Sequence, residues 1–194
     1  IVQRVTELTG LDPALVRRLG GRVDTRTFLR EIRRDEGKVG SVYDSNVTAF
    51  DPFPWSPQQR SNDPLLDALI APTTSAAVDF MTRELGWKTD ARYYALSYAV
   101  NSAWDRGKPA DTPVTDLRKA IAADPKMHVL IVHGWDDLSC PYFASRLIID
   151  QMPAFGQQER VALRVYAGGH MFYSRPDSGA EFKREMLVKI DKIF

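Results

Sequence analysis

Cysteine and long hydrophobic runs are both scarce in this chain. Cys140 is the one cysteine among 194 residues, which excludes a small secreted domain built on several disulfide bonds. The longest run of valine, leucine and isoleucine covers residues 129–132, whereas a transmembrane helix needs about 20 apolar residues. The first residues also lack the basic and then apolar layout of a signal peptide. We therefore expect no membrane partner, and the cysteine count leaves the cellular compartment open.

An excess of charge of either sign is missing as well. The chain has 26 Lys and Arg against 25 Asp and Glu, a net charge of +1, so its overall electrostatics do not favour a nucleic acid. Residues 17–34 are rich in arginine and hold two glycines between helical patterns, which is one feature of a helix-turn-helix. Acidic residues are interleaved with these arginines, as on a solvated surface. We expect no nucleic-acid partner and a small or neutral ligand instead.

The length and composition fit a globular protein with a sizeable core. The chain is 44% hydrophobic and 26% charged, which is typical of one domain or of one domain with a smaller subdomain. Residues 2–35 predict short helices. Asp12 and Asp24 each stand at the position of an N-cap, where the side chain accepts from the first free backbone N–H groups.

The middle of the chain predicts a long loop and then further helix. Residues 37–72 are dense in glycine, proline, aspartate, asparagine and serine, and their aromatic residues favour an ordered loop. Residues 75–105 are predicted to be helical again, with Ser75 as the cap and Gly86 ending the first helix. The aromatic residues at 93–104 are expected in the core or at an interface between subdomains.

The last third of the chain alternates strands and helices, which is typical of an α/β fold. Residues 127–133 and 161–165 predict strands. Apolar residues in the first do not alternate with polar ones, so we expect a parallel sheet covered by helices on both faces. Pro141 begins the helix between them, with apolar side chains toward the core, and Ser178 with Glu181 forms a capping box ahead of the last helix. Two parallel strands are too few for a stable sheet alone.

One acid and one histidine follow these two strands directly. Asp137 comes after the first strand and His170 after the second, where functional side chains lie in open α/β sheets. In a Ser-His-Asp triad the carboxylate fixes the histidine tautomer and stabilises the imidazolium, and the histidine is the general base. The segment between the two residues has room for one helix and one strand. We therefore predict that Asp137 and His170 form an acid–base pair.

Other interpretations of these residues stay open at the level of sequence. Asp137 also suits the N-cap of the helix that follows, and Asp136 suits the acid role equally well by spacing. His170 also fits an ordinary polar turn. Cys140 precedes a helix N-terminus, where a thiol can become a nucleophile, although a lone cysteine is more often a small buried residue.

No metal and no cofactor are expected. His128 and His133 are five residues apart on a predicted strand and therefore face opposite sides of it. No other cluster of metal ligands is apparent in the sequence.

The nucleophile of a triad is missing from the sequence. A nucleophile elbow has the pattern Gly-x-Ser-x-Gly, and this pattern occurs nowhere in the 194 residues. The chain thus holds the acid and the base of a hydrolase without its serine.

Two segments resemble the catalytic loops of the serine carboxypeptidase family. Residues 134–142, GWDDLSCPY, are similar to the acid loop, which has glycine, two variable residues, the triad aspartate and often a cysteine three places on. Residues 164–172, RVYAGGHMF, are similar to the histidine loop of the bacterial branch. The helical cap of that branch is resembled by residues 9–11, 22–24, 28–37 and 40–45, so the resemblance covers nearly the whole chain.

This resemblance implies the C-terminal part of an α/β-hydrolase with a mainly helical cap. Residues 1–110 would form the cap insertion, and residues 111–194 the C-terminal segment of the hydrolase core. The resemblance makes Asp137 the triad acid, in preference to the aspartate before it, and His170 the triad base. The family's serine motif, Gly-Glu-Ser-Tyr-Gly-Gly, and its oxyanion-hole glycines have no counterpart here, so they would lie before Ile1.

The function implied by the resemblance is that of a serine carboxypeptidase, which hydrolyses C-terminal peptide bonds through an acyl-enzyme. The expected partners are a peptide substrate and the N-terminal half of the same enzyme, without a cofactor. The family's digestive and processing roles favour an exported location. The alternatives are an esterase, acyltransferase or lyase on the same scaffold, or a non-catalytic interaction module with a vestigial triad.

Overall fold

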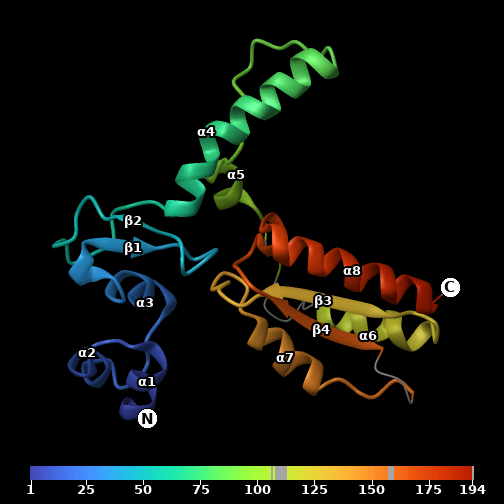
Figure 1. Ribbon diagram of the computed structural model, residues 1–194, viewed down its shortest axis with the longest axis horizontal. Helices are drawn as coiled ribbons and strands as arrows, with labels where there is room; N and C mark the ends of the chain where they lie inside the picture. The colour runs from blue at the N-terminus through green and yellow to red at the C-terminus, as the bar shows by residue number, and fades with distance from the viewer. Residues whose placement is uncertain (106, 108–112, 157–159, 194) are drawn as a thin grey trace.

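The fold is mixed α/β, with helices around two small sheets (Figure 1). A computed structural model describes residues 1–105, 107, 113–156 and 160–193. In this part of the chain one sheet is antiparallel and the other parallel, and each has two strands. The mixed class agrees with the sequence prediction.

The N-terminal helices begin as predicted. They are α1 (Val2–Thr9), α2 (Pro13–Arg18) and α3 (Thr25–Glu31), followed by the 3₁₀ turn η1 (Arg34–Glu36). The carboxylate of Asp12 accepts from the first backbone N–H groups of α2, and that of Asp24 accepts from the backbone N–H of Thr27 in α3. Both predicted N-caps are confirmed.

The predicted loop at residues 37–72 contains three elements that its composition does not predict. These are β1 (Lys38–Gly40), its antiparallel partner β2 (Thr48–Phe50) and the first half of α4 (Pro64–Asp79). Proline and glycine disfavour long regular elements, but strands of three residues are short enough to form among them. Helix α4 runs through Pro72, since losing one backbone hydrogen bond does not end a helix when its other residues favour it.

The helix predicted to begin at Ser75 begins earlier in the structure, but it ends where predicted. Ser75 lies inside α4, whose N-cap is Asp63, so the predicted cap at Ser75 is wrong. A π-helical turn, η2 (Phe80–Glu84), continues α4, and the helical segment ends just before Gly86, as predicted. Helix α5 (Tyr98–Ala103) follows after an irregular stretch.

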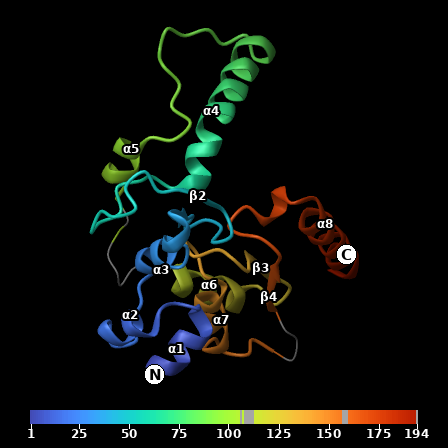
Figure 2. The ribbon, with the colours of Figure 1, turned by 60° about the vertical axis from the view of Figure 1, so that its left-hand side comes forward.

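The parallel sheet carries the predicted strand–helix–strand–helix order. Its elements are α6 (Pro113–Ala123), β3 (Val129–Gly134), α7 (Tyr142–Asp150), β4 (Val161–Tyr166), the 3₁₀ turn η3 (Phe172–Ser174) and α8 (Pro176–Ile193). Strands β3 and β4 pair in parallel from Val129 opposite Val161 to Gly134 opposite Tyr166. Helix α7 packs on one face of the sheet and α8 lies on the other (Figure 2).

The packing of this half is looser than the sequence suggests. Strand β3 is only half-buried for most of its length, and Phe143 and Leu147 of α7 are 57% and 48% exposed. The expectation that the apolar side chains of the helix after Pro141 point toward the core is therefore wrong. The aromatic stretch at residues 93–104 is also largely exposed rather than buried. Two strands bury only a narrow strip of apolar side chains. The unbroken apolar run at residues 129–132 is instead typical of a strand inside a wider sheet.

Ser178 serves another purpose than the predicted capping box. Helix α8 begins two residues earlier, at Pro176, and the buried Ser178 hydroxyl donates to the carbonyl of Ala167 at 2.7 Å. This bond fastens the first turn of α8 to the loop after β4. Within the described residues, none of the helices is both long and apolar enough to cross a lipid bilayer.

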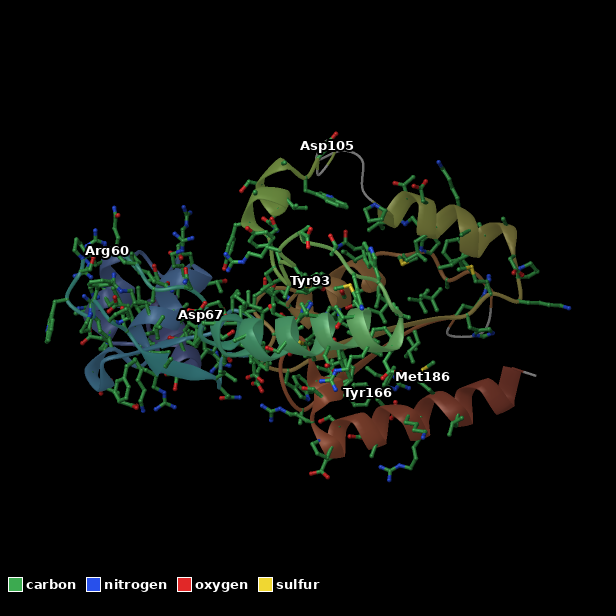
Figure 3. The ribbon with its side chains drawn as sticks, turned by 90° about the horizontal axis from the view of Figure 1, so that it is seen from above. Arg60, Asp67, Tyr93, Asp105, Tyr166 and Met186 are labelled. Atoms are coloured by element: carbon green, nitrogen blue, oxygen red, sulfur yellow. The ribbon has the colours of Figure 1, made fainter. Side chains whose placement is uncertain are left out.

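Tyr166 anchors α8 to the end of β4 (Figure 3). Its ring stacks on Phe172 with centroids 4.9 Å apart and meets Phe182 edge to face, while its hydroxyl donates to Glu185 at 2.7 Å. Burial, together with this carboxylate, raises the pKa of Tyr166 above its ordinary value.

We predict that Tyr166→Phe lowers the free energy of unfolding by about 1 kcal/mol near neutral pH, because one buried hydrogen bond is lost. Since the folded pKa is raised, the wild-type contribution is present below about pH 10 and is lost as the pH rises beyond it. Urea unfolding at several pH values measures this difference. A gap between wild type and variant that stays constant into the alkaline range would contradict the prediction.

Candidate active site

Asp137 lies just beyond the end of β3 and is 4% exposed. Its Oδ1 accepts from the backbone N–H groups of Ser139 and Cys140, both at 2.9 Å, and its Oδ2 accepts from Nδ1 of His170 at 2.8 Å. The N-cap of α7 is Pro141, so Asp137 caps the turn before that helix rather than the helix itself. One oxygen therefore holds the loop and the other holds the histidine.

His170 follows two glycines after β4, and its side chain is 43% exposed. An ionised carboxylate only accepts hydrogen bonds, so Nδ1 carries the proton in the bond to Asp137. Among the described residues, none forms a hydrogen bond with Nε2 of this ring. Nε2 thus has an available lone pair, as a general base requires.

The strand pairing continues past β3 and β4 and brings the two loops together. The backbone N–H of Trp135 donates to the carbonyl of Tyr166 at 3.0 Å, and that of Asp136 donates to Gly168 at 2.9 Å. A Cβ at Gly134 would overlap the carbonyl oxygens of Gly168 and Gly169. The close approach therefore needs glycine at residue 134.

A third segment, residues 42–46, contacts both loops and was not identified as functional from the residues (Figure 1). Val42 and Tyr43 accept through their carbonyl oxygens from the backbone N–H groups of Leu138 at 3.0 Å and His170 at 2.6 Å. The N–H of Ser45 donates to the carbonyl of Asp136 at 3.0 Å. We call residues 42–46 the clamp loop, because it bonds to the acid loop and to the histidine loop.

The side chains of the clamp loop also contact the histidine loop. The buried Asp44 accepts through Oδ2 from the backbone N–H of Gly169 at 3.1 Å and from the guanidinium of Arg175 at 3.0 Å. Its Oδ1 accepts from the N–H of Asn46 at 3.1 Å. The Tyr43 ring meets the His170 ring edge to face, with centroids 5.5 Å apart. Backbone and ring of His170 are both fixed by this segment.

The clamp loop is itself fastened to α4. The carboxylate of Asp63 caps α4 and accepts from the Ser41 hydroxyl at 2.8 Å and from the backbone N–H of Val42 at 2.9 Å. Ser41 is fully buried, and its Oγ in turn accepts from the N–H of Tyr43. The position of His170 therefore depends on a chain of hydrogen bonds that starts at the N-terminus of α4.

The other candidates from the sequence lie close by. Asp136 contributes backbone contacts, and it is Asp137 that reaches His170. Cys140 is exposed, and its Sγ, a ring nitrogen of His170 and a carboxylate oxygen of Asp137 all lie within 4.8 Å of one another. The structure thus gathers three metal-ligating groups that the sequence spacing did not reveal.

His133 is tied into the same region without facing Asp137. Its Nδ1 bonds the carbonyl of Cys140 and its Nε2 bonds the hydroxyl of Ser145, both at 2.9 Å. Both ring nitrogens are therefore used to connect β3, the acid loop and α7. This is a structural role.

Comparison with protein-family models, with curated proteins and with solved structures gave no match to this chain. The interpretation of the site consequently depends on its geometry and on the sequence resemblance given above.

We predict that Gly169→Ala destabilises the protein by more than about 3 kcal/mol, because the new Cβ would overlap the Tyr43 carbonyl and the Asp44 side chain. Gly20→Ala is the contrasting control: unlike Gly169 it has a positive φ, at 62°, but no atom lies within 4 Å of the new Cβ, so a loss of only about 1–2 kcal/mol is expected from the backbone conformation alone. Chemical denaturation followed by circular dichroism measures both. Equal losses would contradict the close packing at Gly169.

We predict that Asp44→Asn destabilises the protein by about 1–3 kcal/mol and loosens His170, because the charged acceptor of Gly169 and Arg175 is lost. Proton NMR of the hydrogen-bonded Nδ1–H should show a broadened or missing resonance. The matched control is Asp51→Asn, since Asp51 is as buried as Asp44, at 7% exposure, and accepts from the N–H of Phe53. An unchanged His170 resonance in the Asp44 variant would remove the positioning role.

Proposed function

We propose that this chain supplies the acid and the base of a serine carboxypeptidase-like α/β-hydrolase, and that the nucleophilic serine comes from sequence outside these 194 residues. The observation that carries the proposal is the bond of 2.8 Å from Nδ1 of His170 to the buried Oδ2 of Asp137. It lies at the carboxyl ends of two parallel strands, where α/β enzymes hold their catalytic groups.

The proposed chemistry follows from the two nitrogens of His170. Nε2 removes the proton of the serine hydroxyl as the oxygen attacks the scissile carbonyl, and it returns the proton to the leaving amine. Asp137 keeps Nδ1 protonated and stabilises the positive imidazolium between these steps. The same base then activates a water molecule. This water attacks the acyl-enzyme, releases the shortened peptide and restores the serine.

Substrate access is proposed to involve the aromatic part of the cap. A hollow of about 610 Å³ has Tyr43, Tyr94, Leu96 and Trp104 among its lining residues. Tyr43 touches the His170 ring, so this hollow lies one side chain away from the base. The clamp loop, α4 and residues 94–104 would therefore shape the approach to the base, as a cap insertion would in the proposed α/β-hydrolase.

We predict that His170→Ala, made in the protein that also carries the serine, lowers the peptidase kcat by about 10³-fold or more, because the general base is lost. Release of C-terminal amino acids from blocked peptides measures it. His128→Ala is the matched control, since it removes an exposed histidine before β3. Near-wild-type turnover in the His170 variant would refute the assignment, and turnover of small esters alone would favour an esterase.

We also predict that the 194-residue chain alone is not labelled by a fluorophosphonate probe, because the probe needs an activated serine. Labelling, detected by mass spectrometry of the intact chain, would show that a serine of this chain is the nucleophile and would contradict the proposal.

A further inference from the structure

We propose that Asp137, Cys140 and His170 also form a binding site for a thiophilic divalent cation of the Zn²⁺ class. Their three ligand atoms lie within 4.8 Å of one another. They offer one sulfur, one imidazole nitrogen and one carboxylate oxygen, the three ligand types that zinc takes in proteins. Three protein ligands would leave one tetrahedral position for water.

The geometry needs only small movements to close around an ion. Zinc lies about 2.3 Å from sulfur and about 2.0–2.2 Å from nitrogen and oxygen, so the ligand atoms around it are about 3.3–3.7 Å apart. The Asp137 and His170 atoms, now at 2.8 Å, would separate slightly, and the Cys140 sulfur would move inward. Cys140 and His170 are both exposed, which leaves their side chains room to adjust.

The ligands are held by bonds that do not involve the ion. The backbone N–H of Cys140 donates to Oδ1 of Asp137, and the carbonyl of Cys140 bonds to His133. The buried Asp137 therefore offers Oδ2 while its other oxygen keeps the loop in place. Such outer contacts orient metal ligands and strengthen binding.

Binding would exchange protons for the ion. The thiol of Cys140 loses its proton to solvent and forms a sulfur–metal bond. The ion also displaces the proton between Oδ2 and Nδ1, which is lost to solvent while Nε2 takes one up, so that one proton is released per ion. Neutral His170 then carries its proton on Nε2 instead of Nδ1. Because Nε2 then has no lone pair, it cannot accept the proton of a serine. The expectation that the bound ion abolishes peptidase activity rests on the proposed function, whereas the binding of the ion does not.

The test is a titration of the chain with Cd²⁺, which reports thiolate binding by a charge-transfer absorption in the ultraviolet, followed by displacement with Zn²⁺. We expect one ion per chain. His170→Ala and Asp137→Asn both retain Cys140, and each should weaken Cd²⁺ binding at least about tenfold. His128→Ala is the matched control and should bind as wild type does.

Equal affinity in wild type and His170→Ala would overturn the proposal, because the ion would then be bound by the thiol alone. Circular dichroism shows whether each variant is folded, and His170→Ala decides the outcome if Asp137→Asn does not fold. In the protein that carries the serine, Zn²⁺ should inhibit wild type reversibly, with the inhibition relieved by a chelator. Cys140→Ser should be inhibited less, relative to its own metal-free rate. Binding of Cd²⁺ without any peptidase activity would retain the metal site and reject the proposed function.

Discussion

Close backbone packing around Gly169 is the constraint on which the candidate site depends. The histidine loop touches the acid loop at Gly134, where a Cβ would overlap the carbonyl oxygens of the histidine loop. It touches the clamp loop at Gly169, where a Cβ would overlap the carbonyl oxygen of Tyr43. Backbone hydrogen bonds at these contacts hold the backbone of His170, and the bond to Asp137 and the Tyr43 ring hold its imidazole. Small movements of any of the three loops would therefore change the bond to Asp137.

Two buried carboxylates hold the histidine loop, one through the imidazole and the other through the backbone. Asp137 binds the imidazole directly, and Asp44 binds the backbone of Gly169 and the guanidinium of Arg175. A buried carboxylate is costly unless it accepts several hydrogen bonds, and each of these two accepts three. The site thus holds one satisfied, buried carboxylate on each side of the histidine loop.

Features that depend on neighbouring residues can be predicted from this sequence, whereas those that depend on contacts between distant residues cannot. The N-caps at Asp12 and Asp24 and the residues after the two parallel strands follow from neighbours a few positions away. The hydrogen bond from the backbone of Gly169 to Asp44 joins residues 125 positions apart, and no local sequence pattern predicts it. Likewise, the Ser178 hydroxyl satisfies Ala167 rather than its own helix, because the tertiary contact is available once α8 has packed.

The exposure of apolar side chains near the parallel sheet bears on the origin of the proposed nucleophile. Phe143 and Leu147 of α7 and Leu187 of α8 are each about half exposed, on the two helices that flank β3 and β4. Large apolar surface of this kind usually packs against something. In the proposed hydrolase, a segment that adds strands beside β3 and β4 and covers these helices would also bring the serine to the same sheet edge as His170. Formation of the proposed triad would then be coupled to completion of the sheet, and the proposed activity would depend on the stability of that packing as much as on the acid–base pair.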